Sequence, residues 1–337
     1  MDSLTQIVLG AGVGEVILGK KVGNKAMLWG AVAGTIPDLD VLAALLTNPL
    51  QAMIWHRGFM HSIVFCAAFA PLLGWLIHKI SKKNNATIKE WSVLCWWALV
   101  THPLLDCFTT WGTQLFWPFD VRITFNGVFV IDPLYTLPFL AFLIVCMRLP
   151  RESLRRKKLS RFALYISTAY LFLGLGFRQI AKSTFEARLN EEEIAYRSID
   201  VKPMPFTNLY WECTAEGEAE FYNAHYSLLG KKENIRFRAI AKNHDLDSAF
   251  RNHSLYQDLL RISKGYYALE TKNDTLLFHD LRFGQTDGIS GQIERRSNFV
   301  YLLQIDNNHL KFNRRSPAIA QGFSYLCEYF SKVVGAD

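Results

Sequence analysis

The sequence lacks the cysteine spacings that are typical of zinc fingers. It contains six cysteines among 337 residues, with no CxxC pair and no cysteine/histidine finger pattern. Four of the six fall inside apolar stretches, where cysteine packs as a small hydrophobic residue: Cys66, Cys95, Cys107 and Cys146. A disulfide between Cys213 and Cys327 is an alternative only if the C-terminal part is extracytoplasmic. Packing is therefore the expected role of most of the cysteines.

Other common signals are missing as well. Met1-Asp2-Ser3 has no basic residue and no small-residue cleavage site follows, so we expect no cleavable signal peptide. There is no internal repeat and no low-complexity segment. The histidines of the second half show no HxH or HExxH spacing, and we expect surface or packing roles for all five: His225, His244, His253, His279 and His309.

Positive charge is concentrated in short segments instead of being spread along the chain. The formal net charge is +7 and the isoelectric point is near 9.0. Lysine and arginine gather between apolar stretches, at residues 20–25, 79–89 and 148–161, which is where membrane topology places them. We therefore expect the lipid bilayer as a partner and no binding of nucleic acid, while protein partners are not predicted.

Hydrophobic residues make up 50% of the chain, but they are unevenly distributed. From Met1 to Phe177 apolar segments alternate with short charged joints, whereas Arg178 to Asp337 has the composition of a soluble protein, with alternating apolar runs typical of strands. The pattern predicts a multi-pass α-helical membrane domain, residues 1–180, followed by a smaller α+β soluble domain, residues 181–337. Leu4–Leu18 is short for a membrane crossing, and the sequence does not decide whether it crosses. The expected spans are Ala26–Leu46, Ile63–Ile77, Trp91–Phe108, Val128–Met147 and Phe162–Phe177.

The basic joints also predict an orientation. Short loops rich in lysine and arginine stay cytoplasmic, so the loops at residues 47–61 and 109–130 are expected outside. The C-terminal domain after Phe177 is then extracytoplasmic, and the protein is expected in the cell (inner) membrane. This topology places the unusual polar residues of the membrane domain in one outer layer.

Ionisable residues inside a membrane are rare and usually functional. Pro37 interrupts an apolar stretch where Asp38 and Asp40 enter. His102 and Asp106 are four residues apart, so on a helix they share a face. Imidazole and carboxylate groups are ligands for zinc, manganese or iron, and zinc is the first expectation here. The expected ligands of one or two ions are Asp38, Asp40, His56, His61, His102 and Asp106.

Two further residues are expected to take part in catalysis. Arg57 lies between the two histidines of the loop, and its planar guanidinium suits an anionic group such as phosphate. Asp132 precedes Pro133 at the start of an apolar segment. A site role and a helix N-cap role stay open for Asp132, because proline is common in the first turn of helices.

A metal-bound water with a lowered pKa is the natural nucleophile at such a site. The expected reaction is hydrolysis of an ester, amide or phosphoester, and the position in the membrane favours a lipid or lipid-linked substrate. Two alternatives stay open. One is an ion-coupled transporter that uses Asp38, Asp40 and Asp106; the other is a non-catalytic membrane anchor that presents the C-terminal domain to a partner.

Five motifs in order resemble the YdjM-like family of predicted membrane-bound metal-dependent hydrolases. They are Met1 to Gln6, Pro37 to Asp40, His56 to Ser62, Thr101 to Asp106 and Ile131 to Tyr135. The resemblance covers residues 1–180 and implies an integral membrane protein with a metal-dependent hydrolase site at Asp38, Asp40, His56, His61, His102 and Asp106. It also implies that the C-terminal part is an attached domain found in a subset of members. This chain has Gln6 and Met60 where many members have histidine and threonine, so no N-terminal ligand is carried over.

Overall fold

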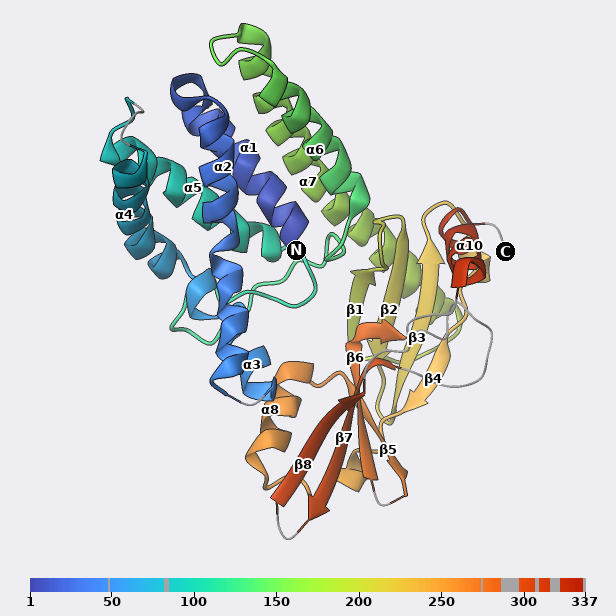
Figure 1. Cartoon of the computed structure of the whole chain (residues 1–337). Coiled ribbons are helices and arrows are strands. Elements are labelled where there is room, and N and C mark those ends of the chain that lie inside the picture. Colours follow the sequence, from blue (N-terminus) through green and yellow to red (C-terminus); the bar gives the residue numbers. More distant parts are fainter. Residues whose placement is uncertain are drawn as a thin grey trace. The chain divides into compact units, whose positions relative to one another are not determined.

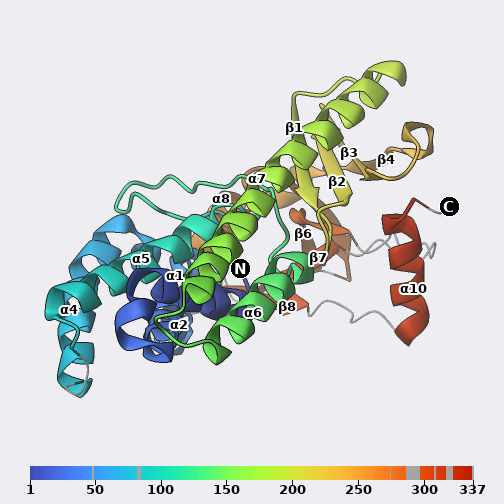
Figure 2. The same cartoon turned by 90° about the horizontal axis from the view of Figure 1, so that it is seen from above.

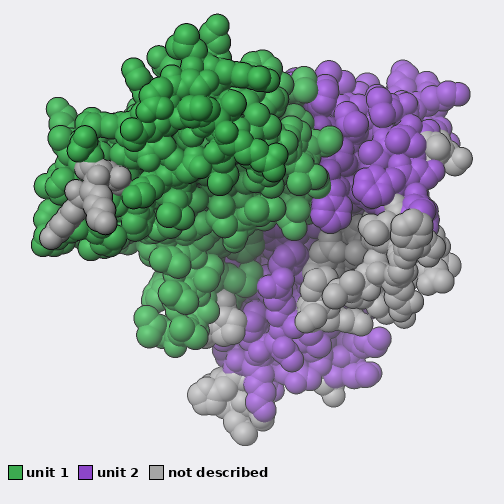
Figure 3. Space-filling model, turned by 45° about the horizontal axis from the view of Figure 1, so that its top comes forward, with its two compact units in different colours: residues 1–175 green, residues 176–337 purple. Residues whose placement is uncertain are grey.

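The structure is a computed structural model that describes residues 1–47, 49–81, 85–273, 275–285, 297–306, 309–315 and 322–335. Residues 82–84 of the basic joint at 79–89 lie outside the described residues. Figures 1 and 2 show helices in the first part of the chain and mainly strands in the second. The chain divides into two compact units, Met1–Leu175 and Gly176–Asp337 (Figure 3), and each is described by itself.

The first unit is mainly helical, with two 3₁₀ segments before α4 and a long loop, residues 107–132, between α5 and α6. α1 packs along α2, α5 and α6, while α4 packs on α5 (Figure 1). α7 begins in the first unit and ends in the second. The elements are α1 (Ser3–Val22), α2 (Asn24–Thr35), η1 (Pro37–Leu45), α3 (Pro49–Trp55), η2 (Phe59–His61), α4 (Ile63–Ile80), α5 (Ile88–Asp106), α6 (Pro133–Arg148) and α7 (Leu154–Glu191).

Glycines let α1 and α2 approach backbone to backbone. A Cβ atom on Gly10 would clash with the carbonyl of Gly30, and one on Gly14 would clash with the carbonyl of Ala26. Small residues four apart on facing helices permit this approach in membrane proteins. The contact fixes the C-terminal end of α2, and with it Gly34, whose backbone contributes to the site described below.

Two described helices are long and apolar enough to cross a membrane, namely α4 and α7. A third span is possible by length and composition if α2 and η1 count as one broken helix, bent by 43° where Pro37 follows Ile36. The expected spans at Trp91–Phe108 and Val128–Met147 correspond to α5 and α6, which are not both long and apolar enough to be candidate spans. α6 has only 16 residues and α5 contains charged groups at both ends. The structure therefore supports a helical unit with two or three candidate spans, fewer than the sequence predicts.

A buried ion pair joins the first and last helices of this unit. The Arg156 guanidinium donates from Nε and Nη2 to the two carboxylate oxygens of Glu15, at 2.6 Å each. Both side chains are almost fully buried. The bidentate geometry suits arginine and explains how a carboxylate is tolerated in the middle of the apolar helix α1.

The second unit contains two antiparallel four-stranded sheets, each with its strands in sequence order. The first sheet packs the side chains of Trp211, Cys213 and Ala215 against the C-terminal part of α7. Cys213 and Cys327 are both free thiols in this structure, so the disulfide that the sequence left undecided is not formed here. The elements are β1 (Ser198–Pro203), β2 (Tyr210–Glu216), β3 (Glu220–Ser227), η3 (Lys232–Asn234), β4 (Arg238–Ala241), η4 (His244–Asp247), α8 (Ser254–Ser263), β5 (Tyr267–Lys272), β6 (Thr275–Gln285), β7 (Ser297–Asp306), β8 (His309–Arg315) and α10 (Gly322–Val333).

Candidate metal centre

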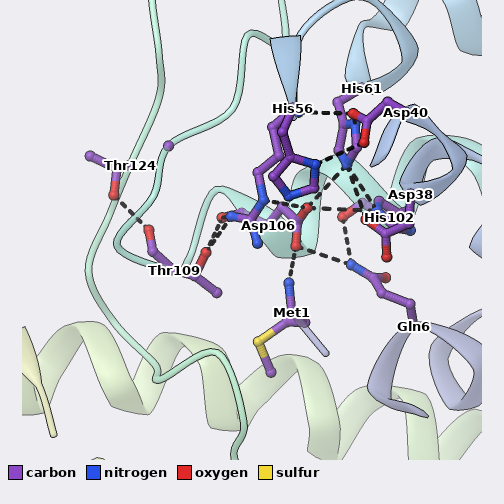
Figure 4. Close-up of polar contacts among 12 residues, drawn as sticks. Met1, Gln6, Asp38, Asp40, His56, His61, His102, Asp106, Thr109 and Thr124 are labelled. Atoms are coloured by element: carbon purple, nitrogen blue, oxygen red, sulfur yellow. Dashed lines mark hydrogen bonds and ion pairs between the residues drawn. The ribbon is translucent and has the colours of Figure 1, made fainter. Parts of the chain in front are cut away.

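Five of the six expected ligand residues lie on three elements, and His56 lies between α3 and η2. Asp38 and Asp40 lie on η1, directly after the bend at Pro37. His61 ends η2, the short turn before α4. His102 and Asp106 lie on the last turn of α5. Figure 4 shows that these side chains, which are up to 68 residues apart in sequence, converge on one small volume.

Four of the six residues present ligand atoms to a common centre: Asp38, His61, His102 and Asp106, whose ligand atoms all lie within 4.8 Å of one another. His61 Nε2 is 3.5 Å from Asp38 Oδ1 and 3.4 Å from Asp106 Oδ2. His102 Nε2 is 3.4 Å from Asp38 Oδ1 and 3.6 Å from Asp106 Oδ2. The two Nε2 atoms are 3.1 Å apart.

The four nitrogen–oxygen separations, 3.4–3.6 Å, match the edges of a metal-ligand tetrahedron. Zinc–ligand distances of about 2.1 Å in a tetrahedral site put neighbouring ligand atoms about 3.4 Å apart. Hydrogen bonds between nitrogen and oxygen are shorter, at about 2.7–3.2 Å. Asp106 Oδ2 is buried, faces both imidazoles and Arg57, and makes no aligned hydrogen bond. The donor set therefore fits a divalent ion better than it fits a closed hydrogen-bond network.

A backbone carbonyl orients His102. The Nδ1 atom of His102 lies 2.5 Å from the carbonyl oxygen of Gly34 at the end of α2. A carbonyl can only accept, so Nδ1 carries the proton and Nε2 keeps its lone pair for the centre. Histidine ligands in metalloproteins are commonly held in this way.

Asp40 contacts the far side of His61 and does not join the four central residues. Its Oδ2 atom is 3.0 Å from His61 Nδ1, which is an ion-pair distance although the two groups are not aligned as a hydrogen bond. Asp40 Oδ1 lies 2.7 Å from His56 Nδ1, and the Arg57 backbone N–H donates to Oδ2 at 2.9 Å. Asp40 and His56 thus lie outside the four-residue group, where they contact a ligand residue, and their own expected role as ligands stays a prediction.

Arg57 faces Asp106 in this structure. Its Nε lies 3.2 Å from Asp106 Oδ2, and its Nη1 donates to the Thr109 hydroxyl at 2.7 Å. The backbone of Arg57 has φ +60, an uncommon conformation for a residue with a side chain. Such strain is often found at functional sites. The guanidinium is almost fully buried, so its expected role of holding a substrate anion would require it to exchange partners.

Gln6 is a site residue that sequence reasoning did not identify. Its side-chain Nε2 donates to Asp106 Oδ1 at 3.1 Å and lies 3.4 Å from the His102 carbonyl oxygen. The nitrogen of Met1 also contacts Asp106 Oδ1. Gln6 is buried, and the signal that could have indicated this contact is that many members of the resembling family have histidine at this position.

Asp132 lies at the start of α6, where the structure favours the N-cap role. Its Oδ1 atom accepts from the backbone N–H groups of Leu134 and Tyr135, at 3.0 and 3.3 Å. Its Oδ2 atom accepts from the Tyr170 hydroxyl at 2.9 Å. Both oxygens are thus engaged, and Asp132 is absent from the metal-ligand group found among the described residues.

An apolar cavity of about 440 Å³ lies on the neighbouring face of α5. Thr101, Leu105 and Cys107, which flank His102 and Asp106 in sequence, contribute to its wall. The rest of the wall comes from α1, α7 and the loop after α5, and includes Leu9, Val13, Leu115, Phe125, Leu171 and Phe172. The site and the cavity thus share one helix, whose diameter is about 10 Å.

The centre is buried except on one side. The side chains of His61, His102 and Asp106 have no exposure, whereas Asp38 keeps 22%. Candidate spans and a buried Asp/His centre together define a membrane protein with a possible metal-binding site.

The model of the YdjM inner membrane protein family matches residues 1–182, and the chain belongs to this family. It is 28% identical to the uncharacterized protein YfhP of Bacillus subtilis (strain 168) over 156 residues, which cover 43% of this chain and 46% of YfhP. It is 30% identical to the inner membrane protein YbcI of Escherichia coli (strain K12) over 115 residues, 33% of this chain and 60% of YbcI. The chain thus spans about half the length of these curated relatives. No solved structure matches it.

Proposed function

We propose that the protein is a membrane-bound metal-dependent hydrolase. The observation that supports this most strongly is the set of 3.4–3.6 Å separations between the Nε2 atoms of His61 and His102 and the carboxylate oxygens of Asp38 and Asp106. A bound Zn²⁺, Mn²⁺ or Fe²⁺ would supply a Lewis acid and lower the pKa of a coordinated water. Zinc is the first choice, because two imidazoles and two carboxylates in tetrahedral spacing suit it.

The residues of the chain hold this arrangement in place. Gly34 fixes the tautomer of His102, and Asp40 fixes the ring of His61. Arg57 and Gln6 hold Asp106 from two directions. Access is expected beside Asp38, the ligand with an exposed edge.

A lipid or lipid-linked ester or phosphoester is the proposed substrate. The apolar cavity beside α5 supports this class, since a hydrocarbon chain in it would bring a polar head within one helix diameter of the centre. The exposed apolar residues of η1, which carries Asp38, favour contact with lipid as well: Leu39, Val41, Leu42 and Leu45. Phosphate release from a lipid phosphoester and acid release from a lipid ester are the two reactions to assay.

An ion-coupled transporter is the second candidate. The bend between α2 and η1, with two carboxylates directly after it, is the feature that favours this class. Proton or cation flux in vesicles without added substrate would support it. A non-catalytic anchor would instead keep its function when the four central residues are replaced together.

Metal analysis of purified protein is the decisive experiment. Wild-type protein, His61→Ala and His102→Ala are compared by elemental mass spectrometry, with His253→Ala as a matched control. His253 precedes α8 in the second unit and forms no side-chain cap there. We expect about one divalent ion per chain in the wild type and the control, and loss of the ion in both site variants. Equal, near-zero metal in all four proteins would end the metalloenzyme proposal.

The proposed location is the inner membrane, with the C-terminal domain extracytoplasmic. A cysteine introduced after Phe177 should then react with an impermeant reagent in intact cells. Protection in intact cells and labelling only after lysis would overturn this orientation while leaving the metal proposal standing.

A further inference from the structure

A second cavity, of about 250 Å³, lies in the second unit. Its buried lining comes from one face of the first sheet and includes Tyr210 of β2 and Asn223 of β3. Its exposed lining includes Lys231, Arg236 and Arg238. We call it the basic pocket.

The register of the sheet explains why polar groups gather here. Tyr210 pairs with Ser227, Glu212 with His225 and Thr214 with Asn223, so these side chains alternate onto one face. The intervening residues of β2 face α7 and form an apolar core. One face of this sheet therefore serves stability, and the other presents buried polar side chains.

The floor of the basic pocket contains a hydrogen-bonding atom that is buried without a partner. His225 Nε2 makes no hydrogen bond, and the nearest carboxylate oxygen, Glu212 Oε2, is 4.0 Å away. The Asn223 amide donates to the other oxygen of Glu212 at 2.6 Å, and the Tyr210 ring stacks on the imidazole at 5.8 Å. The His225 side chain keeps 13% exposure. Buried polar groups in native proteins are nearly always bonded to protein, water or ligand.

The charged side chains that line the pocket are all basic: Lys231, Arg236, Arg238 and Lys332. Two carboxylates lie just outside the lining, Glu328 beside Lys332 and Glu212 beside His225. A cleft with charges of one sign concentrates counter-ions, and guanidinium groups match the oxygens of a phosphate. We propose that the basic pocket binds a phosphate group, from either a soluble phosphate or a lipid headgroup. The volume is below the range of about 300–1,000 Å³ typical of drug-sized ligands, so the ligand is small.

The neutral form of His225 suits this assignment. Burial is the main cause that lowers the pKa of His225; Glu212 opposes this shift, and the basic side chains nearby add to it. A neutral imidazole can donate from Nε2 to a phosphate oxygen while the rim cations supply the charge. Nothing in this site depends on the metal centre of the first unit.

The test is calorimetric titration of inorganic phosphate into the full chain in phosphatidylcholine nanodiscs, in chloride buffer. We expect saturable binding that weakens at least tenfold in the Lys231→Gln/Arg236→Gln double variant. Arg197→Gln is the matched control, because Arg197 is an exposed arginine of the same unit that does not line the pocket. His225→Phe keeps a ring against Tyr210 and removes both nitrogens, so it should weaken binding as well.

The outcomes separate a pocket from general charge attraction. Absence of saturable binding in the wild type, or an equal loss in Arg197→Gln, would overturn the proposal. Circular dichroism and thermal melting show whether each variant is folded, and the exposed rim residues offer substitutions that leave the core intact. Nanodiscs that contain phosphatidate distinguish the two sources. Weaker apparent binding of phosphate in them indicates that a lipid headgroup competes, and unchanged binding indicates a soluble ligand.

Discussion

The contacts around Asp40 predict graded losses of metal affinity. Asp40 lies 3.0 Å from Nδ1 of His61, on the side of the ring that faces away from the centre. Outer contacts of this kind change metal affinity by about 10–100-fold when they are removed, which corresponds to about 1.4–2.7 kcal/mol. We therefore expect Asp40→Asn to weaken metal binding by that amount, and His102→Ala to abolish measurable binding.

Replacing His56 tests whether the loss of metal affinity becomes smaller as a residue lies further from the centre. Its polar contact is with Asp40, at 2.7 Å, its ring meets the His61 ring edge-on with centroids 5.8 Å apart, and its side chain is 29% exposed. His56→Ala removes one of three contacts that hold Asp40, the others being to Arg57 N and His61. We expect a loss smaller than that of Asp40→Asn. The double variant should match Asp40→Asn alone to within about 0.5 kcal/mol, because residues that act through one another are not additive.

The assay is competition between purified protein and a chelating dye at fixed pH. The comparison includes wild type, the two single variants, the double variant and His102→Ala. If His56→Ala lost as much affinity as His102→Ala, His56 would be a direct ligand, and the four-residue centre described above would be wrong.

Three further predictions concern the stability of the fold. Gly30→Leu places a side chain against the α1 backbone, so it should destabilise the protein by about 1–3 kcal/mol or more and reduce its metal content. Gly176→Leu is the control: it has open space around it and should change neither the unfolding free energy nor the metal content in the same assays. Glu15→Gln leaves the buried Arg156 guanidinium without a counter-charge, at a cost of about 3–5 kcal/mol in detergent unfolding, and a further Arg156→Met change should recover part of it. Burial lowers the pKa of His225 in the folded protein, so the unfolded chain binds more protons at low pH. The free energy of unfolding should therefore fall as the pH drops through about 6.5 and below. The melting temperature of His225→Phe should depend less on pH than that of the wild type, and the same dependence in both proteins would show that another group is responsible.

The helical first unit and the sheets of the second could be predicted from periodicity, but the number of spans could not. α5 and α6 look like spans in a hydropathy reading because both are apolar in their middle turns. α5 carries charged residues at its ends and α6 is short, so neither is among the helices that are long and apolar enough to cross a membrane. The sequence thus identified the apolar helices correctly, but it predicted more spans than the structure supports.

The convergence of the polar residues followed from sequence for a physical reason. Ionisable groups are costly inside a membrane unless they have partners, so several of them at one expected depth favour a shared site. Distances to backbone atoms could not be predicted in this way. The Gly34 carbonyl that orients His102 has no sequence signal, since any residue supplies a carbonyl. The partner of Gln6 could not be predicted either, because Asp106 is 100 residues away.

Asp132 shows a limit of local motifs. An aspartate before proline at the start of an apolar run is compatible with an N-cap and with a site residue, because both need an exposed carboxylate near a helix start. The distinction depends on which donors surround the two oxygens. Here those donors are two backbone N–H groups and the Tyr170 hydroxyl.

The pair Asp38 and Asp40 could have been separated by spacing alone. Residues two apart on a helix do not share a face, and in a 3₁₀ helix with about three residues per turn they point in very different directions. The two carboxylates of η1 therefore face different groups: the structure aims Asp38 at the imidazole Nε2 atoms and Asp40 at the Nδ1 atoms of His61 and His56.

This division also explains how three carboxylates share a buried volume. With the imidazoles neutral, as metal ligands require, Arg57 and the Met1 nitrogen leave an excess of negative charge from Asp38, Asp40 and Asp106. A divalent cation removes that excess, since it becomes the largest local charge. The same argument predicts that Asp38→Asn, which removes one central carboxylate and leaves Asp106 paired with Arg57, weakens metal binding and yet keeps a folded helical unit.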